Sequence, residues 1–135
     1  MSTHRFINPE GMMAPAGFSH AAVAAPGRLV FLAGQTAHQA DGTVAGSTLA
    51  EQFAAAIANV AAALAAAGAT PADVVSLQIF TPDVEAYRSE SRAIGAAYRD
   101  VFGPHYPPMA LLGVTRLYDN AALVELVATA VIPDD

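Results

Sequence analysis

The chain has 135 residues, of which 54% are apolar and 13% charged, and its formal net charge at pH 7 is −6. This length predicts a single domain over residues 1–135, large enough to bury a core of its own. The absence of cysteine excludes disulfides, thiolate metal sites and thiol nucleophiles. Because the chain has only six Lys and Arg residues and twelve Asp and Glu residues, a nucleic-acid partner is not expected.

The N-terminal residues contain no apolar signal core, so no secretion signal is predicted. The segment from Phe53 to Ala67 is the only membrane candidate, but it is shorter than the ~20 residues that a span needs, and it contains Asn59. We therefore expect a cytoplasmic protein with no membrane partner. The high apolar content of so small a domain suggests instead that an oligomer interface covers part of the surface.

Hydrophobic periodicity and turn residues predict seven strands and helices. They are strands at residues 21–25 and 28–35, a helix between Thr48 and Gly68, a strand at 74–80, a helix between Thr81 and Gly103, and strands at 109–114 and 123–131. The first helix has the most specific signals: Thr48 and Glu51 form the pattern of a capping box, and Gly68 follows the last apolar residue. With an additional N-terminal strand, this order predicts an α+β fold, a mixed six-stranded sheet with two helices on one face.

In such a fold the second face of the sheet is uncovered, and its apolar residues need a partner. A homo-oligomer supplies one. We expect the alternate apolar residues of segments 29–33 and 75–79 to lie in that interface.

Two common catalytic patterns are incomplete in this chain. Residues 17–21, "GFSHA", resemble a nucleophile elbow, but Ala21 stands where the pattern requires glycine, and the segment precedes a strand instead of following one. The four histidines share no metal-ligand spacing. We therefore predict no metal and no other cofactor.

Gly34-Gln35 and Glu125 are more informative positions. Glycine at the end of an apolar strand often marks a close approach of the backbone to a ligand or another chain, although a plain strand exit explains Gly34 equally well. Glu125 lies among apolar strand residues, so its carboxylate must reach solvent, a partner or a pocket. Exposure on an edge strand is the alternative.

Three segments in order resemble the RidA/YjgF reactive-intermediate deaminase family. They are "GFSHAAVAAPGRLVFLAGQTA" (17–37), "NVAAALAAAGATPADVVSLQIFTPDVEAY" (59–87) and "YPPMALLGVTRLYDNAALVELVATAV" (106–131). The resemblance implies a chorismate-mutase-like fold, a homotrimer and small-molecule pockets between subunits. It also implies hydrolysis of enamines or imines such as 2-aminoacrylate, in which an arginine clamps the substrate carboxylate and a glutamate handles water or a proton.

Matched to the family pattern, this chain lacks both of those groups. Met109 falls at the position of the arginine and Val127 at that of the pocket glutamate, while Glu125 matches the preceding glutamate of the motif. The pattern further places Phe18 where the family has tyrosine, His20 where it has glutamine, and Gly95 where it has asparagine. The resulting candidates for ligand binding are Phe18, Gly34, Gln35, Tyr87, Gly95, Met109, Leu111 and Val127, and the candidates for catalysis are Glu125, His20 and Tyr106.

Three functions are compatible with these candidates. The first is a variant enzyme acting on an imine, an enamine or a similar metabolite, and the second is a non-catalytic binding module for an apolar or aromatic metabolite. The third is the ribonuclease activity ascribed to some relatives, against which the acidic charge argues. The sequence leaves open whether Arg92 or Arg116 of a neighbouring subunit replaces the missing clamp.

Overall fold

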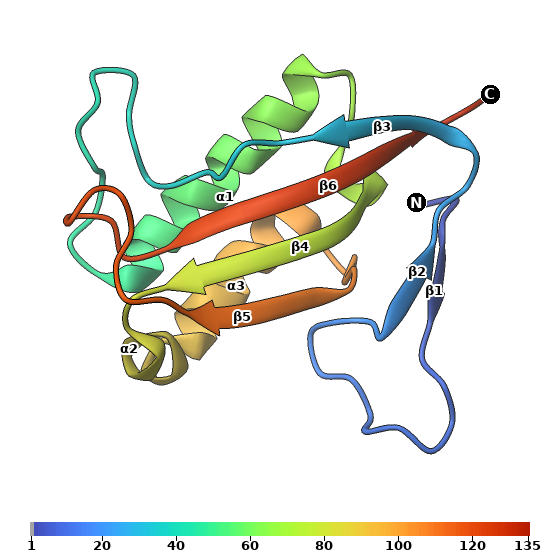
Figure 1. Ribbon diagram of the computed structural model, residues 1–135, viewed down its shortest axis with the longest axis horizontal. Helices are drawn as coiled ribbons and strands as arrows, with labels where there is room; N and C mark the ends of the chain where they lie inside the picture. The colour runs from blue at the N-terminus through green and yellow to red at the C-terminus, as the bar shows by residue number, and fades with distance from the viewer. Residues whose placement is uncertain (1) are drawn as a thin grey trace.

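The computed structural model describes residues 2–135, which form a two-stranded sheet, a four-stranded sheet and three α-helices. The elements are β1 (Arg5–Ile7), β2 (Ala21–Val23), β3 (Gly27–Phe31), α1 (Leu49–Ala66), the 3₁₀ turn η1 (Pro71–Asp73), β4 (Val74–Thr81), α2 (Val84–Ser89), α3 (Ser91–Phe102), β5 (Met109–Gly113) and β6 (Glu125–Pro133). Figure 1 shows α1 and α3 on one face of the four-stranded sheet, while β1, β2 and the loop between them project from it as an arm. The fold is therefore a mixed α+β fold, as predicted.

The division into two sheets corrects the prediction of one six-stranded sheet. The larger sheet has the order β3-β6-β4-β5, with β4 and β5 parallel and the other neighbours antiparallel. Within residues 2–135, β1 and β2 pair with each other alone. Pro26 separates β2 from β3 and has no N–H to donate to a ladder, so the chain leaves one sheet before it enters the other.

The first helix has the boundaries that its capping signals predict. The Thr48 hydroxyl accepts a hydrogen bond from the Glu51 backbone N–H at 3.1 Å, and the Glu51 carboxylate accepts one from the Thr48 N–H at 3.1 Å. Gly68, with a φ of 85°, follows the C-cap. With 18 residues and a mean hydropathy of 1.5, α1 is long and apolar enough to span a membrane, but its apolar face packs in the core. A core helix of a globular domain has the same properties, so α1 gives no evidence of a membrane span.

The second predicted helix is in fact two helices, α2 and α3. The start of α2 lies slightly later than the predicted start at Thr81: Asp83 is the N-cap, and its carboxylate accepts a hydrogen bond from the Ala86 N–H at 3.0 Å. At Glu90 the backbone leaves the helical region, with φ −100° and ψ 13°. The Glu90 carboxylate accepts a hydrogen bond from the Ala50 N–H in the first turn of α1 at 3.1 Å. The N–H groups of a helix's first turn have no partner within the helix. The break between α2 and α3 places Glu90 where it supplies the acceptor that the Ala50 N–H needs.

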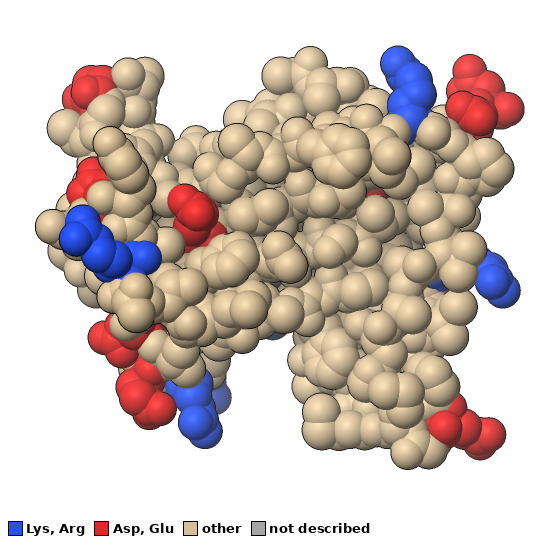
Figure 2. Space-filling view, viewed as in Figure 1, with Lys and Arg blue, Asp and Glu red and all other residues tan. Residues whose placement is uncertain are grey.

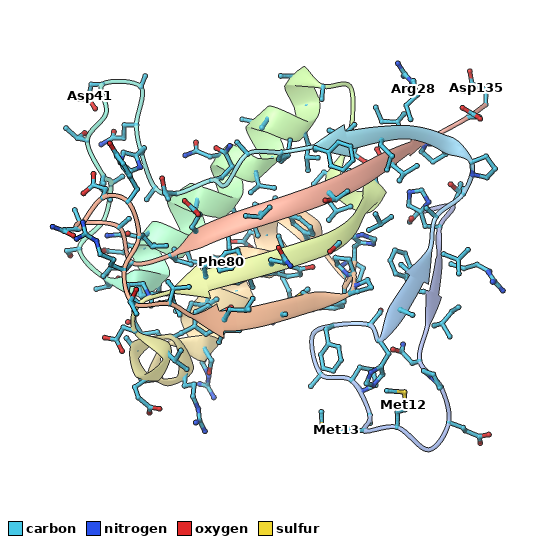
Figure 3. All side chains as sticks on the ribbon, viewed as in Figure 1. Met12, Met13, Arg28, Asp41, Phe80 and Asp135 are labelled. Carbon is cyan, nitrogen blue, oxygen red and sulfur yellow. The ribbon has the colours of Figure 1, made fainter. Side chains whose placement is uncertain are left out.

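The two faces of the four-stranded sheet have different surroundings. Leu77 and Ile79 point into the core beneath the helices and are 0% and 4% exposed, which corrects their expected place in an interface. The opposite side, here called the open face, carries Leu29, Phe31, Ser76, Gln78, Phe80, Ala110, Leu112, Glu125, Val127 and Thr129. Figure 2 shows that charged residues gather around the rim of this side and leave its centre almost uncharged, and Figure 3 shows Phe80 on this side near the end of β4.

Candidate functional site

A cavity of about 250 Å³ opens beside β5. Its walls are formed by Gly17, Phe53, Ile79, Tyr87, Ser91, Ile94, Gly95, Tyr98, Arg99, Tyr106 and Met109. Four of the residues that the sequence suggested are among them: Tyr87, Gly95, Tyr106 and Met109. The structure thus brings together the candidates that come from α2, α3 and the start of β5.

Met109 reaches this wall because the segment before it is fixed on both sides. The Ser19 hydroxyl donates to the Tyr106 carbonyl oxygen at 2.6 Å, and the Leu77 N–H donates to the Pro108 carbonyl oxygen at 3.0 Å. Met109 then pairs with Leu77 across the parallel ladder, and paired residues in neighbouring strands point to the same face. Its side chain therefore lies on the helix side of the sheet, at the margin of the core and in the wall of the cavity.

Tyrosines give the cavity an aromatic wall with polar groups. The Tyr98 hydroxyl donates to the His105 carbonyl oxygen at 2.5 Å, and its ring stacks on that of Tyr106, with centroids 5.4 Å apart and planes 12° apart. Burial raises the pKa of Tyr87 to about 12, and it also raises the pKa of Tyr98. Both hydroxyls are therefore protonated at neutral pH, so the Tyr87 hydroxyl is able to donate a hydrogen bond to a ligand, as the Tyr98 hydroxyl does to His105.

Other candidates lie at the open face, across the sheet from the cavity. Gly34 lies directly against Glu125: a Cβ atom added to Gly34 would be 2.7 Å from the Glu125 Cδ atom. The sequence suggested that the Gly34 backbone closely approaches a ligand or another chain. In the structure it approaches the Glu125 side chain of the same chain. Val127 pairs with Gln78 on the open face, so the sheet separates Glu125 and Val127 from Met109. Gln35 differs from them: it bonds to the core residue Leu126 through its own N–H and carbonyl, at 2.7 and 2.8 Å, so it points to the helix side but does not line the cavity.

The remaining candidates lie outside the cavity wall as well. His20 belongs to the arm, where its Nε2 atom is 2.7 Å from the Met13 carbonyl oxygen and its ring meets the edge of Phe18 with centroids 5.2 Å apart. Leu111 is on the helix side of β5 but 38% exposed. One chain therefore does not bring His20, Glu125 and Tyr106 into a common site.

Arg99 is the wall residue that sequence reasoning missed. Within one chain Arg92 and Arg116 are exposed and do not line the cavity, and their role from a neighbouring subunit stays a prediction. Arg99 lies one helical turn after Gly95, and a Cβ atom at Gly95 would be 3.2 Å from the Arg99 Nη1 atom. Since residues four apart share a helix face, the pair was visible in the sequence.

An α+β chain with its long helices on one face of a mixed sheet, an apolar open face and this cavity has the architecture of the Rid-type proteins. The family model described as Endoribonuclease L-PSP matches residues 10–132. The chain therefore belongs to this family, the RidA/YjgF/L-PSP family.

Several solved structures are similar over nearly their whole length. The Rid-family protein YyfB of Yersinia pestis, described as of unknown function, is 36% identical over 96% of this chain and 98% of its own, with a TM-score of 0.85. Rv2704 of Mycobacterium tuberculosis, a member of the YjgF/YER057c/UK114 family, is 30% identical over 96% and 100%, with a TM-score of 0.64. TdcF of E. coli, solved with bound serine, is 25% identical over 90% and 91%, with a TM-score of 0.66. None of the curated proteins matches the sequence significantly.

Proposed function

We propose that this protein binds a small metabolite of the enamine or imine class, or an analogue of one, in the cavity beside Met109, with the cytoplasm as its expected location. The observation that carries the proposal is the position of Met109 in the cavity wall. A thioether is at best a weak acceptor and cannot form the two parallel hydrogen bonds by which a guanidinium holds a carboxylate. We therefore do not expect the ordinary 2-aminoacrylate deaminase activity. The serine bound by TdcF supports a ligand of amino-acid size.

The proposal includes a homotrimer. Leu29 and Phe31 on the open face are 62% and 73% exposed, and burial of such a surface drives association. β3 and β5 are the two edges of the sheet, so a closed ring of copies sets the β3 side of one copy against the β5 side of the next. Glu125 and Gly34 of one copy would then approach the Met109 cavity of another.

The separation of the candidate catalytic residues limits the reactions that one chain can catalyse. Tyr106 is the candidate catalytic group present in the cavity of one chain, and with Glu125 across the sheet no acid–base pair forms without a second copy. Binding needs no such pair. A non-catalytic binding module is therefore the simpler form of the proposal, and a variant enzyme requires the trimer.

A coupled assay with 2-aminoacrylate tests the absence of ordinary deaminase activity. The rate should equal the spontaneous rate of hydrolysis under conditions in which a relative with the pocket arginine accelerates the reaction. Turnover comparable to that of the relative would show that other groups do the work of the missing arginine and glutamate.

The family description names an endoribonuclease, which keeps ribonuclease activity as a second candidate. Contacts to RNA phosphates require cationic side chains, yet the chain has six Lys and Arg residues and a net charge of −6. The open face is also nearly free of charge (Figure 2). These observations favour a small ligand over RNA. Ribonuclease activity would be favoured instead if the purified protein cleaved RNA at a rate proportional to its concentration through every purification step.

A further inference from the structure

We infer that Arg99 is the anion-binding group of the cavity and that the ligand is a small monocarboxylate with an aromatic or branched apolar body. This inference rests on the proposed function, because it names the class of ligand that the same cavity binds. In this inference Arg99 of α3 binds the ligand carboxylate, and position 109 of β5, which is Met109, does not.

The first support is the charge of the wall. Arg99 is the single charged residue among those that line the cavity in the described part of the chain. Within residues 2–135 the only ion pairs closer than 4.0 Å are His38–Asp119 and Arg88–Glu85, so no carboxylate neutralises Arg99. In a chain of net charge −6, an unneutralised guanidinium at a cavity gives that site a preference for anions.

The second support is Gly95, which lies one helical turn before Arg99 and has no side chain to crowd its guanidinium. A Cβ atom at Gly95 would lie 3.2 Å from Arg99 Nη1, which is tighter than most Cβ contacts, and 3.9 Å from Cζ, which is an ordinary contact distance. Glycine in a helix interior costs about 1 kcal/mol relative to alanine, and Gly95 has an ordinary helical backbone without positive φ. Glycine at this position leaves room for the Arg99 guanidinium to lie back along the helix beside the cavity.

The remaining wall indicates the body of the ligand. Phe53, Ile79 and Met109 form an apolar side, and stacked Tyr98 and Tyr106 present flat rings. Arg99 lines the cavity and is exposed to solvent, so its guanidinium can pair with a ligand carboxylate that stays in contact with water. The volume of about 250 Å³ lies below the ~300–1,000 Å³ of pockets for drug-sized ligands. A ring or branched chain with one carboxylate fits these dimensions and this polarity.

Benzoate and benzamide are suitable probes, since they have the same ring and nearly the same size but differ in charge. Isothermal titration calorimetry of the full-length protein should show benzoate binding about tenfold more tightly than benzamide, as expected when a charged hydrogen-bonding partner is present. In Arg99→Gln the two affinities should become equal through loss of benzoate binding. Arg99→Lys should retain part of the preference, because lysine keeps the charge but not the planar fork.

Arg88→Gln is the control, because Arg88 is exposed on α2, next to the wall residue Tyr87, but does not line the cavity. Its preference for benzoate should equal that of the wild type, and circular dichroism should show that all variants are folded. Equal binding of both probes by the wild type, or a preference retained in Arg99→Gln, would overturn the role of Arg99 and leave the proposed binding site standing. Failure of the wild type to bind either probe at millimolar concentration would overturn both.

Discussion

Met109 and Leu77 are paired neighbours in the β4–β5 ladder, yet their surroundings differ. Leu77 is 0% exposed and lies within the core cluster, whereas Met109 is partly buried at the edge of the core and lines the cavity. A long cationic side chain at position 109 can keep its stem against apolar neighbours while its head reaches water. At position 77 the same head group would be buried without a partner.

We therefore predict that Met109→Arg lowers the thermal unfolding midpoint only slightly, while Leu77→Arg destabilises the protein by several kcal/mol. Thermal unfolding followed by circular dichroism compares the two variants directly. Met109→Arg should also bind small carboxylates such as benzoate more tightly than the wild type. Similar large losses of stability in both variants would show that Met109 is a core residue.

His105 makes a second residue-level prediction, based on its surroundings. Its Nε2 atom is 2.9 Å from the Val74 carbonyl oxygen, and its ring contacts Phe6 and Phe102. Burial lowers the pKa of His105 below the ordinary value of 6.5. As the pH falls below about 6.5 the unfolded chain takes up a proton that the folded chain does not, so folded-state stability is lost until the folded pKa is passed.

The free energy of unfolding should thus fall more steeply with acidification in the wild type than in His105→Gln, which keeps an N–H donor but does not titrate. Urea unfolding at a series of pH values below neutrality measures both slopes. Because the other titrating groups are common to both proteins, the difference isolates His105. Parallel slopes would mean that its ring is accessible to protons in the folded state.

At the scale of elements, the cap of α1 has a measurable contribution. Thr48→Ala removes the hydroxyl that accepts from the Glu51 N–H, and we predict a loss of about 1 kcal/mol in the free energy of unfolding. Thr3→Ala is the control, because Thr3 is exposed and precedes no helix; it should change stability little. Equal effects of the two substitutions would indicate that the cap does not stabilise the helix.

The elements whose signals are local in sequence were predicted correctly. The capping box of α1 and Gly68 after its C-cap depend on residues within one turn, and the structure has both. The interruption at Glu90 depends on Ala50, which lies 40 positions earlier, and no periodicity within the second helix reveals it. The separation of β1 and β2 likewise depends on how the chain turns at Pro26, which sequence alone leaves undetermined.

The candidate site was predictable to the extent that residues share an element or a face. Tyr106 and Met109 are nearly adjacent in sequence, and Gly95 and Arg99 share a helix face, so their convergence follows from simple spacing. The relation between Glu125 and Met109 does not, since it requires the pairing of β6, β4 and β5. Once that register is known, alternation along the strands places the two residues on opposite faces.

At the scale of the whole molecule, the open face and the arm each expose apolar side chains. Phe31 on the open face is 73% exposed, and Met13 at the tip of the arm (Figure 3) is 74% exposed. We predict that Phe31→Asp dissociates the proposed homotrimer, because its interface would bury an unpaired carboxylate, and that Met13→Asp leaves it assembled. Analytical ultracentrifugation compares the variants. An intact oligomer in Phe31→Asp would place the interface elsewhere.

The proposed homotrimer would bring Glu125 and Gly34 of one copy to the Met109 cavity of another, and the mass of the wild-type protein in solution tests this assembly most directly. Multi-angle light scattering at micromolar concentration should give three times the 13.8 kDa mass of one chain. A mass equal to one chain would contradict a site assembled between subunits.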